Sequence, residues 1–306
     1  DQKALDKILD FGSNQVFENA TTYCCLLFLS ANKKINFNYI KVNPALLKEE
    51  LNFSNLAVSE YSNDVWSFQG ENENGILTKL NLQSVKLIDL PCEISRGSST
   101  GNDTIFIVQE NPDGTYKTSN GDTINLEKAI LKKPIYATNF SRYNFKKDTK
   151  EFLIFPYHLN DKASLIDEVE LKKLYPLTYS YLQSQRVKLE ERAQYQKWYA
   201  FSAPRSLLLH SKADILIPLL ADKGIFTELP LNKDLYTLMA GGGFSISIFN
   251  ENINRHFLLG LLNSNLLFWV LKNVSNVFRG GWITCTKQYF SQLPIKKIDE
   301  QNKSEK

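Results

Sequence analysis

Residues 257–295 read FLLGLLNSNLLFWVLKNVSNVFRGGWITCTKQYFSQLPI, and they join three unlike pieces of chain. An apolar helix is followed by a Gly-Gly loop that carries Arg279 and Trp282, and Pro294 ends a short polar-aromatic segment. The surrounding interval 252–298 contains no Asp or Glu, so its cations are free to meet a polyanion. The sequence therefore predicts a buried scaffold helix that presents a basic loop. The cations of the interval are Arg255, Lys272, Arg279, Lys287, Lys296 and Lys297.

The composition is that of a globular chain with room for two domains. Its 306 residues are 43% hydrophobic and 12% aromatic, which is enough to fill proper cores. The 36 Lys and Arg only slightly outnumber the 33 Asp and Glu, so the net charge of +3 identifies no partner by itself. The clustering of charge along the chain is therefore more informative than its sum.

The four cysteines form no CxxC pair and have no histidine at the spacing of a zinc site. Cys24 and Cys25 lie in an apolar, strand-like run, where reduced core thiols are expected, and this indicates a reducing compartment. The longest apolar run, 257–271, is interrupted by polar residues at 263–265 and is too short to cross a bilayer. We therefore expect a cytoplasmic protein with no membrane partner.

The first residues predict the edge of a larger domain. LDKILDFG at 5–12 has the apolar spacing of a helix, and a chain that begins within it at Asp1 is expected to be part of a longer protein. Residues 13–42 predict a β-hairpin, with an apolar TTYCCLLFLS strand, a turn at 32–34 and an alternating INFNYIKV strand. A run that is apolar on both faces suits the centre of a sheet, so we expect residues 1–45 to be the trailing edge of an upstream domain.

The rest of the chain alternates between strand and helix signals. The Gly-punctuated loop RGSSTG at 96–101 precedes an apolar strand at 104–108, and GGGFSISIF at 241–249 is a glycine turn that leads into another strand. Residues 171–192 have helical periodicity. The expected buried face of that helix consists of Leu174, Leu177, Tyr181 and Leu182.

These signals together predict a mixed α+β fold. Residues 1–85 are expected to hold the terminal β-hairpin of an upstream α/β domain and a connector with helical pieces. Residues 86–295 are expected to form a β-rich domain with helices, and residues 296–306 a polar tail.

Two further intervals lack acids, 128–147 and 192–213, and both are rich in aromatic residues such as Tyr143 and Trp198. Cations neutralise phosphates while aromatic side chains contact sugars and bases, so this pattern favours nucleic-acid binding. Ordinary solvated surface explains any one interval about as well, and only the three intervals together favour the polyanion. The cations here are Lys128, Lys132, Lys133, Arg142, Lys146, Lys147, Arg192, Lys197, Arg205 and Lys212.

Two other classes of function stay open on the sequence alone. Glu170-Leu171-Lys172 matches half of a metal-nuclease signature, with Asp113 or Asp161 as an upstream partner, although such a triplet is common by chance and a helix surface explains it better. The apolar helix at 258–271 is equally consistent with a protein-docking surface. No GxSxG motif supports nucleophilic catalysis, and His158, His210 and His256 are isolated in the sequence.

Taken in order, several segments resemble the C-terminal part of the Taq-like, N6-adenine-specific DNA methyltransferases, which include fused type II (type IIG-like) restriction-modification enzymes. The first segments are VFENATTYCCLLFLS at 16–30 and ISRGSSTGNDTIFIV at 94–108. FLIFPY at 152–157 follows, and LLGLLNSNLLFWVLK with FRGGWITCTKQYFSQLPI ends the series within 258–295. The resemblance covers nearly the whole chain, and its specificity lies in the order of the segments.

The resemblance implies that residues 1–85 are the end of a methyltransferase domain and residues 86–295 a target-recognition domain for bacterial defence. Phe17 looks like the aromatic residue that stacks on the flipped adenine in this family. The family's S-adenosylmethionine loop and Asn-Pro-Pro-Tyr loop are absent from this sequence and would lie upstream in the same polypeptide. We therefore expect no cofactor and no catalytic residue in this chain, and S-adenosylmethionine in the parent enzyme.

Double-stranded DNA is the partner that the resemblance implies, and the basic intervals suggest which residues contact it. Phosphate contacts are expected from Lys132, Lys133, Arg142, Lys146 and Arg279. Base or groove contacts are expected from some of Arg96, Thr100, Asn102, Arg205, Trp282 and Lys287.

Overall fold

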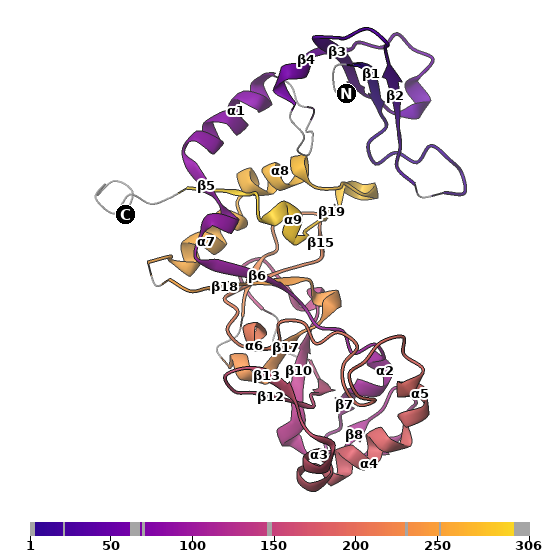
Figure 1. Cartoon of the computed structure of the whole chain (residues 1–306), viewed down its shortest axis with the longest axis vertical. Helices are drawn as coiled ribbons and strands as arrows, with labels where there is room; N and C mark the ends of the chain where they lie inside the picture. The colour runs from indigo at the N-terminus through magenta and orange to yellow at the C-terminus, as the bar shows by residue number, and fades with distance from the viewer. Residues whose placement is uncertain are drawn as a thin grey trace.

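Three units follow one another down the long axis of the molecule in Figure 1, which shows a computed structural model of the chain. A small N-terminal sheet lies at the top, a sheet covered by the C-terminal helices lies in the middle, and a larger lobe lies at the bottom. The structure describes residues 4–296 except 21, 62–67, 69–70, 146–148, 230–231 and 251, and it leaves out the side chains of residues 60, 71–74 and 279. The predicted polar tail therefore lies almost wholly outside the described residues.

The N-terminal unit is a four-stranded sheet in the order β2-β1-β3-β4. β1 is antiparallel to β2 and parallel to β3, and β3 is antiparallel to β4. Leu5, Ile8 and Phe37 form its small core with Val58 and Tyr61. The strands are β1 (Leu5–Asp10), β2 (Cys25–Leu29), β3 (Asn36–Lys41) and β4 (Ser54–Ala57).

Two predictions for this unit are wrong. Residues 5–10 form a strand and not a helix, because β1 receives backbone partners from β2 on one side and β3 on the other. β2 and β3 are not a hairpin, since β1 lies between them. The predicted strand runs are present, but only long-range pairing decides their order, and a local pattern does not carry that information.

A long helix, α1 (Glu71–Leu82), leads from this sheet into the middle unit (Figure 1). It is followed by β5 (Ser84–Lys86), which pairs antiparallel with β20 (Pro294–Lys296). The last described strand of the chain therefore returns beside the connector.

The middle unit is built on an antiparallel sheet in the order β16-β14-β18-β6, and the C-terminal helices pack against it. Its strands are β6 (Cys92–Arg96), β14 (Ile215–Ile217), β16 (Thr227–Glu228) and β18 (Phe244–Ile248), and the short pair is β15 (Leu220–Ala221) with β19 (Ile283–Thr284). Its helices are α6 (Leu207–His210), α7 (Arg255–Leu262), α8 (Asn265–Val274) and α9 (Lys287–Phe290).

The apolar helix predicted at 258–271 is buried, as expected, but it is divided into α7 and α8. Ser264 begins α8 by accepting a hydrogen bond from the backbone N–H of Leu267 at 3.1 Å, and the two helices bend by 61° at this point. In the described part of the chain no single helix meets the length and hydropathy needed to cross a membrane, whereas this bent pair together does. Leu258, Leu262 and Leu271 lie in the protein core, so α7 and α8 act as scaffold.

The lower lobe contains a six-stranded sheet in the order β17-β10-β11-β7-β8-β9 and a small β12–β13 hairpin. Three consecutive helices, α3 to α5, contribute to the same hydrophobic core as this sheet. Its strands are β7 (Ile107–Glu110), β8 (Tyr116–Lys117), β9 (Thr123–Ile124), β10 (Leu131–Ile135), β11 (Glu151–Ile154), β12 (Tyr157–Leu159), β13 (Ala163–Leu165) and β17 (Tyr236–Leu238). Its helices are α2 (Asp103–Phe106), α3 (Glu168–Leu174), α4 (Pro176–Ser184) and α5 (Arg186–Glu190).

Short 3-10 turns complete the described elements. They are η2 (Pro44–Leu46), η3 (Val58–Glu60), η4 (Leu87–Asp89), η5 (Lys128–Ile130), η6 (Ala137–Asn139), η7 (Lys233–Leu235), η8 (Ala240–Gly242) and η9 (Arg279–Gly281).

The predicted mixed α+β class is confirmed by these sheets and helices. Helical structure at 171–192 is confirmed as α3, α4 and α5, but the predicted buried face is partly wrong. Leu182 is buried as predicted, but Leu174 and Leu177 are exposed. The helices also bury Leu171, Thr178 and Leu189, which were not predicted. Pro176 starts a new helix after Leu174, so one helical phase does not run through the whole segment. The strand expected at 104–108 begins only at Ile107, because Asp103–Phe106 forms α2.

Candidate nucleic-acid interface

Two predicted contact residues, Arg96 and Arg205, lie on neighbouring segments of the chain. Arg96 ends β6, and Arg205 lies beside the loop that follows β6. Ser98 donates its hydroxyl hydrogen to the backbone carbonyl of Arg205 at 2.9 Å. Arg96 is exposed at the end of β6, with its guanidinium 6.0 Å from the centre of the Phe244 ring, and Arg205 is exposed as well. Gly97 is required here, because a Cβ at this position would collide with the backbone carbonyl of Met239. The structure therefore joins two chain segments, each with an exposed arginine, that are 109 positions apart in the sequence.

Thr100, another predicted contact, shapes this loop from the inside. Its side chain is fully buried, and its hydroxyl donates to the Asp103 carboxylate while accepting from the backbone N–H of Asn102 at 3.1 Å. Its carbonyl accepts a hydrogen bond from Arg192 at 2.6 Å. With its hydroxyl bound inside the protein, Thr100 supports the loop, whereas the half-buried Asn102 lies nearer its surface.

Arg192 belongs to a predicted basic interval, yet it works as an internal clamp. Its guanidinium donates to four backbone carbonyls, those of Thr100, Leu189, Trp198 and Ala200, at 2.6 to 2.8 Å. Burial lowers its pKa from the ordinary value. This residue holds the loop that follows β6, and it does not present its charge to a partner.

Three predicted phosphate contacts already donate to backbone carbonyls. Lys132 reaches the carbonyl of Asp234 at 2.5 Å and Lys133 that of Thr149 at 2.9 Å, while Arg142 donates to the carbonyl of Asn263. Burial lowers the pKa of Lys132, and the Asp234 charge opposes this shift. Each of the three side chains keeps further N–H groups, so these contacts position the charges and do not remove them.

The loop that contains Gly280 and Gly281 lies against the loop of residues 11–24, which carries Phe17. The Tyr23 and Phe278 rings meet edge to face with their centres 5.9 Å apart. Gly280 and Gly281 both have φ of +79°, which favours glycine, and they turn the chain back toward Trp282. Phe17 is 56% exposed and Trp282 42% exposed, so both aromatic rings are available to a ligand.

The structure describes only some of the remaining predicted contact residues. Lys287 is exposed at the first residue of α9. Lys146 and the side chain of Arg279 lie outside the described residues.

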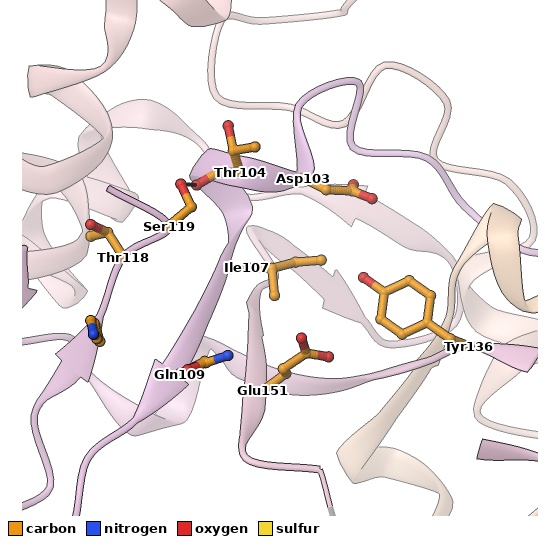
Figure 2. Close-up of a pocket in the computed structure, with 9 residues that line it drawn as sticks. Asp103, Thr104, Ile107, Gln109, Thr118, Ser119, Tyr136 and Glu151 are labelled. Carbon is orange, nitrogen blue, oxygen red and sulfur yellow. Dashed lines mark hydrogen bonds between the residues drawn. The ribbon is translucent and has the colours of Figure 1, made fainter. Parts of the chain in front are cut away.

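A pocket of about 470 Å³ on the lower lobe was not predicted from the sequence (Figure 2). It lies where α2, β7, β8 and β11 meet, next to the turn that follows β10, and its polar lining includes Asp103, Gln109, Lys117, Tyr136 and Glu151. A signal for it exists in the sequence, since the polar Gln109 is next to the buried Val108 on β7 and the polar Glu151 is next to the buried Phe152 on β11. That signal becomes readable only once the two strands are known to pair.

The metal-nuclease alternative has no support in the described residues. Glu170 is 3.2 Å from the Nε2 of His158, and Lys172 lies over the Tyr179 ring. Asp113 accepts hydrogen bonds from the backbone and hydroxyl of Thr115, at 3.0 and 2.7 Å. Among the residues that the structure describes, no group of three or more His, Cys, Asp or Glu is placed to hold a metal ion.

The residues present do not fit S-adenosylmethionine either. β1 leads through the loop of residues 11–24 into β2, and no described helix follows it as a cofactor-binding strand-loop-helix unit requires.

Comparison with known proteins agrees with the resemblance seen in the ordered segments. No protein-family model matches the chain. The chain is 26% identical over 325 aligned positions to the type II restriction enzyme and methyltransferase RM.Eco57I of Escherichia coli. The match covers 98% of this chain and 32% of that protein, so the chain spans about a third of its relative's length. The expected relationship to type II restriction-modification enzymes is therefore confirmed.

Two solved structures are similar over most of the chain at 11% sequence identity each. One is the type IIG restriction endonuclease BpuSI, with a TM-score of 0.43 over 98% of this chain and 38% of that one. The other is the type IIL restriction-modification enzyme MmeI in complex with DNA, with a TM-score of 0.48 over 95% of this chain and 34% of that one.

Proposed function

We propose that this chain recognises a DNA sequence for a bacterial restriction-modification enzyme that methylates adenine at N6. The observation that carries the proposal is that Arg96 and Arg205 are both exposed and lie on adjoining chain segments, in a molecule whose lower lobe has a polar pocket on a sheet face. Guanidinium groups bind phosphates and base edges bidentately, and polar side chains on a rigid sheet can read base edges. The similarity to a restriction enzyme and methyltransferase supports the same function.

In this proposal the role of each predicted contact residue depends on whether its side chain is exposed, anchored to the backbone or buried. Arg96, Asn102, Arg205, Trp282 and Lys287 lie at or near the surface and contact the groove or the bases. The anchored side chains of Lys132, Lys133 and Arg142 contribute positive charge to phosphate binding, together with Lys146 and Arg279. Thr100 acts by supporting the loop, because its hydroxyl is bound internally.

We infer that the methyltransferase domain of the same polypeptide packs against the N-terminal sheet. β2 is an edge strand, and all five of its residues are exposed although the strand reads CLLFL. An exposed apolar edge strand is a template for further strands, so residues 1–85 complete a sheet whose remainder lies in that domain. S-adenosylmethionine and the transfer chemistry belong there, and Phe17 stacks on the flipped adenine from this side.

We also propose that the protein is cytoplasmic, because its cysteines are free. All four cysteines are free, but Cys25 is exposed and Cys24 half-buried, so the expectation that both are core thiols is wrong. Cys285 is instead buried in an apolar environment that raises the pKa of its thiol to about 12. Buried neutral thiols persist in a reducing compartment, which is consistent with a protein that acts on DNA in the cytoplasm.

The test is a fluorescence-anisotropy titration of a labelled duplex at low salt, with the 306-residue chain and three variants. Arg205→Ala and Arg96→Ala are expected to weaken binding by about tenfold each, because each removes a charged contact. Lys48→Ala removes the same charge from the exposed surface of the N-terminal unit and is expected to change the affinity by less than about twofold. No binding by the unchanged chain, or equal losses in all three variants, contradicts the proposal.

A further inference from the structure

The six-stranded sheet of the lower lobe has two unlike faces. On one face Val108, Tyr116 and Phe152 pack into the hydrophobic core together with Leu171 and Leu182 of α3 and α4. Alternate residues of a strand point to opposite faces, so Gln109 and Glu151 point to the face opposite Val108 and Phe152, where Leu153 is buried and Ile107 lines the pocket. A ligand can therefore approach the second face at the level of Gln109, where the pocket opens.

A row of polar side chains crosses this second face at one level. The strand register pairs Gln109 with Glu151 of β11 on one side and with Lys117 of β8 on the other. Side chains that are paired across neighbouring strands lie about 5 Å apart at their Cβ atoms. The row Glu151, Gln109 and Lys117 thus forms a continuous polar floor on three adjacent strands.

The pocket of about 470 Å³ stands over this floor. Figure 2 shows Asp103 on one side of the space and Glu151 on the other, with the Tyr136 ring directed between them. Burial raises the pKa of Tyr136, and the charges of Asp103 and Glu151 raise it further, so its hydroxyl stays protonated as a donor.

The pocket retains unused acceptors. One oxygen of Asp103 accepts a hydrogen bond from the Thr100 hydroxyl. Within the described residues the Glu151 carboxylate and the Gln109 amide form no hydrogen bond or ion pair with another side chain or with the backbone, so both are available to a ligand. Acceptors from two carboxylates and one amide converge on a single concave site.

We propose that this pocket reads the exocyclic amino group of one adenine or cytosine in the major groove of the target duplex. The inference rests on the proposed DNA-recognition function and names the bases that this site selects. A carboxylate accepts hydrogen bonds from the amino groups of cytosine N4 and adenine N6, and it repels the keto oxygens of guanine O6 and thymine O4. Gln109 is suited to adenine, since its amide pairs with N6 and N7 together.

Cations around the pocket offset the repulsion between its carboxylates and the DNA backbone. Lys117 lies in the lining itself, and Lys188 of α5 lines an adjacent small pocket that shares Thr104, Thr118 and Ser119 with it. Arg96 and Arg205 flank the loop that leads to Asp103. Phosphate contacts by such rim residues position the duplex, while the floor supplies discrimination between bases.

The experiment is a selection from a duplex library randomised over about one helical turn, followed by sequencing of the bound fraction. The 306-residue chain is compared with Glu151→Gln and Asp103→Asn, which keep side-chain shape but exchange an acceptor-only carboxylate for an amide. Glu110→Gln is the matched control, because Glu110 lies next to Gln109 on β7 but pairs with Lys128 at 3.9 Å. Thermal melting checks that each variant is folded.

The unchanged chain is expected to select a motif in which one position favours adenine or cytosine about tenfold to a hundredfold over guanine or thymine. Glu151→Gln should reduce the preference at that position to less than about threefold and leave the other positions unchanged, with Asp103→Asn acting in the same direction. Glu110→Gln should keep the whole motif.

Two different results overturn two different claims. A clear motif that survives both Glu151→Gln and Asp103→Asn overturns the assignment of this pocket, while DNA recognition stands. A chain that binds DNA but enriches no motif overturns the proposed recognition function itself, and the pocket assignment falls with it.

Discussion

Strand β2 and helix α8 have similar apolar sequences, but only one of them is buried. The five residues of β2 read CLLFL and are all exposed, with Leu29 at 66%. The apolar core of α8, LLFWVL, buries Leu267, Phe268, Val270 and Leu271 under the sheet of the middle unit. The difference lies in the partners that this chain supplies, since α8 meets α7, α9 and a sheet, whereas β2 is an edge strand. An apolar run therefore predicts that a segment will be covered, but it does not predict which part of the protein covers it.

Removal of a core leucine from α8 tests the buried side of the comparison and has the largest expected effect. Leu271 is fully buried, so Leu271→Ala should lower the free energy of unfolding by about 2 to 5 kcal/mol through lost contacts and a cavity. Urea denaturation followed by fluorescence measures this change. Leu266→Ala, on the exposed face of the same helix, serves as control and should change it by less than about 1 kcal/mol. Equal losses in the two variants would mean that α8 is not packed as described.

A buried histidine provides a second test of the middle unit, through pH. Burial lowers the pKa of His210 to about 4 from the ordinary 6.5, although a hydrogen bond with the Arg96 carbonyl opposes the shift. Between these values the unfolded chain binds a proton that the folded chain does not, so stability falls as the pH falls from about 6.5 to about 4. The expected loss is about 3 kcal/mol across that window.

Comparison with His210→Asn isolates this contribution, because asparagine does not titrate. The difference in unfolding free energy between the two proteins should shrink as the pH falls through the same window. A difference that stays constant from pH 7 to pH 4 would show that His210 protonates equally in the folded and unfolded chains.

Substitution in β2 tests the exposed side of the comparison, where the smallest effect on stability is expected. Leu27 is 55% exposed, so Leu27→Ser should change the free energy of unfolding by less than about 0.5 kcal/mol while reducing self-association. Denaturation and sedimentation velocity measure the two quantities on the same samples. A loss above about 1.5 kcal/mol would show that a second copy of this chain already covers β2 in solution.

The sequence predicted the types of most long elements, and it failed where distant pairing decides the outcome. The helices at 171–192 and 258–271 follow from periodicity, and the strand after the glycine turn at 241–243 follows from turn chemistry. Residues 5–10 misled the helix prediction, because Leu5, Ile8 and Leu9 have a spacing that both a helix and a strand can bury. No local signal could show that β1 enters between β2 and β3.

Charge intervals along the sequence do not reveal which of their cations are paired within the protein, for a similar reason. Lys128, Lys197 and Arg255 come from acid-free intervals, yet each forms an ion pair with an acid from elsewhere in the chain. Lys132 and Arg142 instead donate to backbone carbonyls, which the sequence does not reveal. The exposed pair Arg96 and Arg205 was predicted residue by residue, but their proximity depends on the contact between Ser98 and Arg205.

The most direct test of DNA recognition is the salt dependence of duplex binding by the 306-residue chain. We expect the cations of the proposed DNA-binding surface to displace counterions that are condensed on the duplex. The logarithm of the association constant should then fall linearly with the logarithm of salt concentration, with a slope of about −3 or steeper. Arg205→Ala should make that slope shallower by about one, since one phosphate or groove contact is lost. A slope near zero, or no binding at about 50 mM salt, would contradict the proposal that this chain recognises DNA.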